Sequence, residues 1–410
     1  MNNLYFKAIG FAVFLFPFTF LPAQKAADTS QVLPERTFKK IDLFPAISYA
    51  PETKLTLGGI GYYYLDLYRG GPATKISNIN FLAVYTLNKQ VALEGYWDIF
   101  TDANRWRARG EAFYNKYPDR NYGRGNEPGL TVIEYLENDE RDTLNYLPFN
   151  SDRIKLAPTI LRSVSPNLYL GLQGEMEYLW NSKPMLDNYG FAGADSTGIT
   201  NMPVEGIRSG LGLSLLYDSR DYVLNPIKGT LVSFGTLHFG KWMGSDYGFH
   251  SYRLDARQFI NTTLNHTLAL RTVVNLRFSK DPIPMRGLSQ VGGRDFIRGY
   301  FKGTYQDNHV FALEAEYRLP LWREGSSSRL WQVWKRLGLA AFAGGAQVFP
   351  ELQEFGLREM NWAVGGGIRF LFNEESRVNL RIDYAVALDP DSDGQGKRQS
   401  GLYFFLAEAF

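Results

Sequence analysis

Cysteine is absent from the 410 residues. This excludes disulfide frameworks, thiolate metal sites, cysteine nucleophiles and a lipoprotein anchor. After residue 23 there is also no continuous apolar run of the roughly 20 residues that a membrane helix needs, and the mean hydropathy is −0.25. Charge of one sign is not in excess either, with 44 basic and 42 acidic residues. No long-range field attracts nucleic acid, so we expect no nucleic-acid partner.

Aromatic residues and glycine are abundant instead. Aromatics make up 15% of the chain, and there are 40 glycines. This mixture suits strands, tight turns and interfacial aromatic girdles better than the core of a soluble protein.

The first residues have the features of a secretory signal peptide. Residues 1–23 combine Lys7, an apolar run over 8–21 and the small residue Ala23. A membrane anchor is the alternative, but the run is short for one. We expect a signal peptide at 1–23, a polar periplasmic linker at 24–40 and a transmembrane β-barrel at 41–410.

Side chains alternate between apolar and polar along most of the chain after residue 41. In the segment from Val378 to Val386, apolar residues at every second position are separated by Asn379, Arg381 and Asp383. A soluble sandwich would have to bury these charges, whereas a wall between lipid and a wet lumen needs such a pattern. The sequence therefore predicts an all-β, antiparallel transmembrane barrel in contact with lipid, in the outer membrane of a Gram-negative bacterium.

Counting such segments gives sixteen strands, which would place both termini in the periplasm. The expected ranges are 42–49, 55–68, 78–87, 90–100, 106–116, 152–163, 168–180, 207–218, 229–240, 248–260, 266–279, 309–319, 336–348, 362–372, 378–388 and 401–410. The long connections 117–151, 181–206, 280–308, 349–361 and 389–400 then fall on the extracellular side.

Four motifs resemble one family. The connection 280–308 contains VGGRDFIRGY, and its Ile297, Arg298, Gly299 and Tyr300 resemble the (V/I)-R-G-(F/Y) tip of the sixth extracellular loop in the BamA/TamA superfamily. The other three are YDSRDYVLNPIKG at 217–229, EYRLP at 316–320 and NLRIDY at 379–384. Five strands follow the loop, as in the family. The chain resembles a bacterial surface antigen family member that lacks N-terminal POTRA domains.

The resemblance implies that the sixth loop folds into the lumen and that Arg298 anchors it. The family usually carries F-x-D-x-G in strand thirteen, and its aspartate pairs with the loop arginine. Here Gly344 occupies the position of that acid. An unpaired guanidinium in a narrow lumen is costly, so we expect a substitute partner among the inward-facing Glu314, Glu316 and Asp383, with a loosely held loop as the alternative.

The first and last strands carry the candidate seam of the barrel. Pro45 cannot donate a hydrogen bond to a neighbouring strand, although it could instead mark only the start of its strand. The last strand carries Phe404, Leu406 and the terminal Phe410 on one face, a series that Glu408 interrupts. This pattern suits a strand that the assembly machinery recognises by β-augmentation, and equally suits a lipid-facing strand. In the BamA/TamA superfamily such a seam is where the wall is thought to open.

Catalytic and metal-binding motifs are not evident. The segment GLSQV at 287–291 lacks the second glycine of a nucleophile elbow, and the four histidines show no ligand-type spacing. We expect no enzymatic activity, no cofactor and no metal.

The resemblance implies assistance in assembly, insertion or translocation of envelope proteins or lipids, with separate periplasmic or outer-membrane partner proteins. Two alternatives stay open: a passive outer-membrane channel, and a scaffold subunit of a membrane complex that could be a homodimer.

Overall fold

The computed structural model describes residues 40–406 except 51–53, 68–73, 88, 102, 128–132, 138–139, 145, 186–204, 263–265, 294–295, 322–335, 374–376 and 394–395. The expected signal peptide at 1–23, all of the expected linker but residue 40, and Phe410 lie outside the described residues. Within the described part, no helix is long and apolar enough to cross a membrane.

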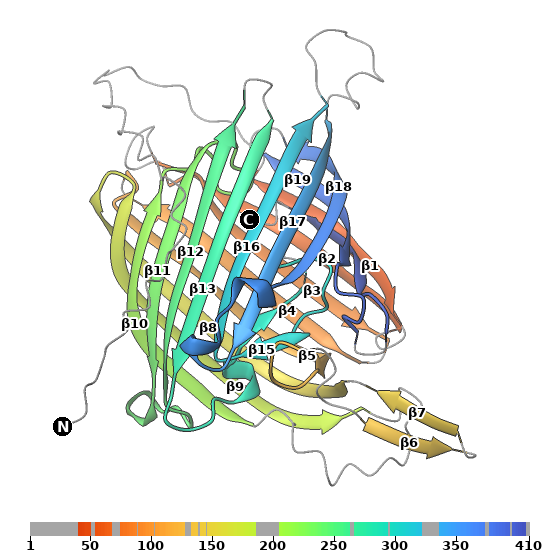
Figure 1. The fold of residues 1–410 in the computed structure, drawn as a ribbon. Coiled ribbons are helices and arrows are strands. Elements are labelled where there is room, and N and C mark those ends of the chain that lie inside the picture. Colours follow the sequence, from red (N-terminus) through yellow and green to blue (C-terminus); the bar gives the residue numbers. More distant parts are fainter. Residues whose placement is uncertain are drawn as a thin grey trace, which may run out of the picture. The chain divides into compact units, whose positions relative to one another are not determined.

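In the part of the chain that the structure describes, sixteen strands form one antiparallel sheet, in which neighbours in the sheet follow one another along the chain (Figure 1). They are β1 (Ile41–Ala50), β2 (Lys54–Leu65), β3 (Ser77–Thr86), β4 (Val91–Thr101), β5 (Trp106–Asn121), β8 (Leu147–Ser165), β9 (Leu168–Pro184), β10 (Gly206–Asp218), β11 (Gly229–Phe239), β12 (Phe249–Asn261), β13 (Thr267–Phe278), β16 (His309–Pro320), β17 (Leu337–Phe349), β18 (Asn361–Asn373), β19 (Val378–Ala387) and β20 (Ser400–Leu406).

Two small ladders lie outside this sheet. They pair β6 (Ile133–Glu137) with β7 (Glu140–Leu144), and β14 (Ser289–Val291) with β15 (Tyr305–Asp307). The described connections also contain four single-turn 3₁₀ helices: η3 (Lys241–Met243), η4 (Met285–Gly287), η5 (Leu352–Glu354) and η6 (Leu357–Glu359). All of these elements lie at the same end of the sheet, which we call the loop end; the opposite end, with the connection 166–167, is the turn end.

Every expected strand range overlaps one strand of the main sheet, but the connection expected at 117–151 is wrong at both ends. β5 continues to Asn121 and β8 begins at Leu147, and the two strands stay paired over these extra residues. Phe149 in the extension is fully buried. Pro118 and the charges after it hide the alternation in the sequence, whereas the ladder and the buried ring hold the strand extended.

The two faces of the sheet differ sharply in chemistry. On β19, Asn379, Arg381 and Asp383 are buried, while Ile382 and Tyr384 on the opposite face are exposed. The same division holds across the sheet: one face, the charged face, carries buried arginines and carboxylates, and the other carries exposed Leu, Ile, Tyr and Phe side chains. An exposed apolar face of this extent is typical of contact with hydrocarbon.

The first and last parts of the sheet meet through side chains. Phe44 on β1 packs edge-on against Phe372 on β18, with ring centroids 4.5 Å apart. Phe44 and Leu380 on β19 also pack against buried Tyr62 and Tyr64 on β2. Among the described residues no ladder joins β1 to β20, so the hydrogen-bonded sheet stops short of the closed cylinder predicted from the sequence.

The apolar face can be tested at Leu213, in the middle of β10, whose side chain is exposed opposite Leu172 of β9. We expect Leu213→Arg to destabilise the protein folded in phosphatidylcholine vesicles by about 2–4 kcal/mol, because the charge would lie in hydrocarbon. Urea titrations followed by tryptophan fluorescence measure this, with Leu213→Phe as the apolar control. Equal stability of both variants would show that this face does not contact lipid.

Candidate functional site

The connection between β13 and β16 folds back as a narrow hairpin. The β14–β15 ladder forms its base, and the Gly303 N–H donates to the Val291 carbonyl at 2.9 Å. Gly292 has φ of +102°, a conformation that only glycine adopts without strain. The chain turns there, and the Gly293 N–H donates to the Tyr300 carbonyl at 2.9 Å. These bonds hold the two arms of the hairpin together.

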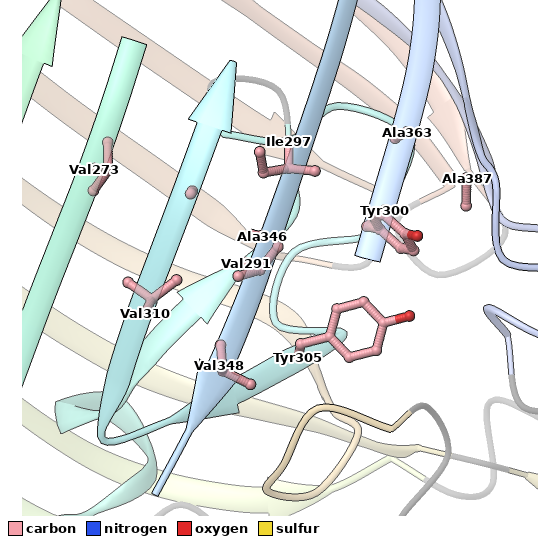
Figure 2. Close-up of a cluster of buried hydrophobic side chains, with 11 residues drawn as sticks. Val273, Val291, Ile297, Tyr300, Tyr305, Val310, Ala346, Val348, Ala363 and Ala387 are labelled. Carbon is pink, nitrogen blue, oxygen red and sulfur yellow. The ribbon is translucent and has the colours of Figure 1, made fainter. Parts of the chain in front are cut away.

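The hairpin packs on the charged face through an apolar cluster (Figure 2). Its contributors from the hairpin are Val291, Ile297, Tyr300 and Tyr305, all at most 1% exposed. The sheet contributes Val273, Val310, Ala312, Ala346, Val348, Ala363 and Ala387. The small residues on β16–β19 leave space for the hairpin, and burial of the larger side chains provides the main attraction.

Arg298 is the charged centre of this contact. Its guanidinium donates to Asp383 Oδ2 at 2.5 Å and to Glu316 Oε2 at 2.5 Å. The same group lies 3.5 Å from the ring centroid of Phe342 on β17. Arg298 is 3% exposed and both carboxylates are fully buried. Two carboxylates and an aromatic face thus replace the water that the guanidinium loses.

Two of the three candidate partners therefore contact the loop arginine. Glu314 does not: it accepts a hydrogen bond from the Ile297 backbone N–H at 3.0 Å and pairs with Arg271 at 3.1 Å. Among the three candidates, Glu314 lies one pleat further toward the loop end than Glu316. Glu314 therefore binds the backbone of the hairpin and not the guanidinium of Arg298.

Gly344 fits the hairpin by its lack of a side chain. It lies opposite Glu314 in the β16–β17 register. A Cβ at this position would lie 3.1 Å from Ile297 Cδ1 and 3.2 Å from Glu314 Cγ. An aspartate here would crowd Ile297 and place a second negative charge beside Glu314. Glu316 and Asp383, on other strands, provide the carboxylates that bind Arg298. The absence of a side chain at Gly344 leaves room for Ile297.

Each carboxylate of the cluster also has a second arginine. Glu316 accepts from Arg318 at 2.8 Å, and Asp383 accepts from Arg369. These arginines come from β16 and β18, so the cluster ties adjacent strands together as well as the hairpin. Phe342 is the phenylalanine of the F-x-D-x-G position in the sequence, but its contact with Arg298 was not predicted. Arg369 was not singled out at all, because its closeness to Arg298 depends on strand register.

Gly299 and Tyr300 complete the contact with the last strands. Gly299 has φ of +116°, and a Cβ there would lie 2.9 Å from Ala363 Cβ and 3.1 Å from the Val386 carbonyl carbon. Its N–H donates to the hydroxyl of Tyr403 on β20 at 3.0 Å. Burial raises the pKa of Tyr300 to about 12, so its hydroxyl stays protonated and donates to the Trp362 carbonyl at 3.0 Å.

The seam residues lie at the free edges of the sheet. The Tyr64 N–H donates to the Lys40 carbonyl at 2.9 Å, so even-numbered β1 residues exchange bonds with β2. Pro45 therefore turns its backbone nitrogen toward the open edge, where it has no hydrogen to donate. It lies within β1, not at its start. Phe404 is exposed on the apolar face of β20; Leu406 ends that strand.

The second family-like motif, at 217–229, forms a charged cluster at the turn end. Asp218 accepts from Arg107 on β5 at 2.7 Å and from Arg220 at 2.8 Å. Arg107 also pairs with Asp98 on β4 at 2.6 Å. Asp221 accepts from backbone N–H groups of the turn. The motif therefore links a turn to β4 and β5. The high density of charged residues in the motif is the sequence signal from which this role could have been predicted.

Two histidines that sequence spacing left unrelated also meet. His238 and His250 lie directly opposite in the β11–β12 register, with their Nδ1 atoms 2.8 Å apart. One ring donates this hydrogen bond to the other, a contact that needs no metal.

We expect Arg298→Ala to release the hairpin from the sheet. Removing one partner of a buried ion pair costs about 3–5 kcal/mol, while Glu316 and Asp383 keep Arg318 and Arg369. The measurement is the rate of trypsin cleavage after Lys302 in detergent, which should rise about tenfold or more. The control is Arg124→Ala, since Arg124 pairs with Asp307 of the same hairpin but is 41% exposed and should matter little.

A second variant separates packing from charge in the same assay. Gly299→Ala should also accelerate cleavage, because its Cβ meets β18 and β19. Gly303→Ala should not, since Gly303 has a similar φ of +78° but nothing closer than 3.9 Å. Cleavage at the wild-type rate in both Arg298→Ala and Gly299→Ala would contradict the role given to this contact.

Comparisons with known proteins agree with this architecture. No curated protein matches the chain. Among solved structures, BamA from Haemophilus ducreyi lacking POTRA domains 1–3 is similar with a TM-score of 0.52 and 12% identity, over 90% of this chain and 70% of that chain. CdiB from Acinetobacter baumannii gives 0.51 and 12%, over 90% and 60%. CdiB from Escherichia coli gives 0.53 and 12%, over 92% and 63%.

At this identity the solved structures establish likeness of fold alone, and the chain spans only 60% to 70% of their length. The family itself is shown by sequence, since the pattern of the Omp85 superfamily domain matches residues 77–410. This chain belongs to the Omp85 superfamily.

Proposed function

We propose that the chain forms a closed, sixteen-stranded barrel in the Gram-negative outer membrane and assists assembly, insertion or translocation of envelope proteins or lipids. The exposed apolar face supports lipid contact, and the Phe44–Phe372 contact supports closure of β1 toward the last strands. The charged face then lines a lumen, and the hairpin at 289–307 narrows it from the extracellular side.

One observation carries this proposal: the hairpin is fixed to β19 and β20, at one free edge of the sheet. Arg298 is bound by Asp383 on β19, and Gly299 by Tyr403 on β20. The opposite edge, β1, presents Pro45 without an N–H. A seam that lacks backbone bonds can open and offer its edges to a client strand, while the hairpin keeps β18–β20 in register.

The mechanism is noncovalent in this proposal. A client strand pairs with an exposed edge through main-chain hydrogen bonds, and no residue acts as a nucleophile or metal ligand. Delivery of the client belongs to separate periplasmic or outer-membrane partner proteins. A homodimer is the alternative partner arrangement, and size measurement in detergent distinguishes it.

The seam can be tested by cross-linking, because the natural chain has no cysteine. We expect an oxidised pair formed by Leu43→Cys with Leu402→Cys or Phe404→Cys to stop insertion of a small outer-membrane barrel into proteoliposomes. Insertion should return on reduction. The control pair Leu215→Cys and Phe234→Cys, opposite each other on β10 and β11, should have no effect. Full insertion with the seam locked would contradict the proposal.

Conductance distinguishes this function from a passive channel. In planar bilayers the wild type should be mostly closed, and Arg298→Ala should produce frequent openings because the hairpin leaves the lumen. Arg124→Ala should behave as wild type. A steady open pore that Arg298→Ala leaves unchanged would favour the channel.

A further inference from the structure

Arg277 on β13 is a partly buried cation that forms no salt bridge with the residues that the structure describes. Its Nε and Nη1 atoms are buried and have no hydrogen-bond partner there. Its backbone N–H donates to His309 Nδ1 at 3.1 Å. Burying an unsatisfied guanidinium is costly. Native structures rarely retain such a group unless water or an ion satisfies it.

The surroundings of Arg277 make its charge more costly still. Arg208 and Arg253 repel it, while Glu175 and Glu177 attract it. Both carboxylates are already bound by other cations: Glu175 pairs with Arg208 at 2.7 Å and with Lys155 at 3.4 Å. Glu177 lies 3.3 Å from Arg208 and 4.0 Å from Arg153. The local balance is therefore positive.

Within the described part of the chain, two neighbouring arginines also lack hydrogen-bond acceptors for part of their side chains. Arg208, 8% exposed, and Arg286 each have a buried Nε without a partner among the described residues. They adjoin, because Arg208 Nη1 donates to the Arg286 carbonyl. Arg286 also pairs with Asp119 at 2.8 Å. Glu175 interacts electrostatically with Arg208 and Arg277, and Glu177 with Arg208 and Arg286. Four guanidinium nitrogens of these three arginines have no hydrogen-bond partner among the described residues.

We infer that Arg277, Arg208 and Arg286 form a binding site for an oxyanion of the phosphate class on the charged face, near the loop end. Several N–H donors from planar guanidinium groups match an anion with several acceptor oxygens better than a monatomic ion. Such an anion neutralises the excess charge and satisfies the buried donors together. The site goes beyond the proposed function, since it rests on these contacts whether or not the seam opens.

The test compares binding of inorganic phosphate to wild type and to Arg277→Gln. We expect phosphate to raise the melting temperature of the purified full-length protein in detergent, more than chloride does at equal ionic strength. Arg277→Gln should weaken binding of radiolabelled phosphate at least tenfold. Without phosphate, the same variant should melt at or above the wild-type temperature, because it removes an uncompensated charge; a merely structural arginine would give the opposite sign.

Arg162→Gln is the matched control, since Arg162 is exposed on the apolar face beside Trp106 and should leave phosphate binding unchanged. Displacement of bound phosphate by glycerol 3-phosphate identifies a soluble ligand, and displacement by a short-chain phosphatidic acid identifies a lipid headgroup. Equal effects of phosphate and chloride, no phosphate binding by wild type, or undiminished binding by Arg277→Gln would overturn the inference.

Discussion

A guanidinium group that leaves water needs carboxylates and fixed dipoles to replace its hydration, and Asp383 and Glu316 meet this requirement for Arg298. Its two carboxylates stand on β16 and β19, separated by β17 and β18. Both lie on the charged face, so the contact exists only if all four strands are paired in the observed register. A shift of β16 or of β19 by one residue would turn the acid on that strand toward the apolar face.

The sheet therefore positions the hairpin through the same alternation that separates its faces. Small residues on β17 and β18 create the space, as at Gly344 and Ala363, and the buried side chains of the hairpin fill it. Charge then fixes the depth at which the hairpin sits, since Arg298 reaches both acids only when Ile297 fits beside Gly344. Packing and ion pairing are coupled, and neither alone specifies the position.

Strand positions could be predicted from the sequence because a two-residue period is a local property. The same signal failed at the β5–β8 extension, where proline and adjacent charges break the pattern, and at β14 and β15, which have three residues each and show no period. Contacts between side chains on different strands were harder to predict from the sequence. Glu314, Glu316 and Asp383 could all be assigned to the charged face, but register decides that Glu314 holds a backbone N–H while the others hold the arginine. The positions of Phe342 and Arg369 beside the Arg298 cluster also depend on strand register.

The two arginine clusters on the charged face differ in how their charge is balanced, and this difference separates structure from binding. At Arg298 the hairpin arginine meets acids at hydrogen-bond distance on other strands. At Arg277 the nearby acids already pair with Arg208, Lys155 and Arg153, and donors stay unsatisfied among the described residues. A cluster that only holds strands together gains nothing from an additional buried cation, because each uncompensated charge opposes folding. An added cation is useful where an anion arrives from solution, so the positive excess at Arg277 argues for a ligand and the paired cluster at Arg298 for a clamp.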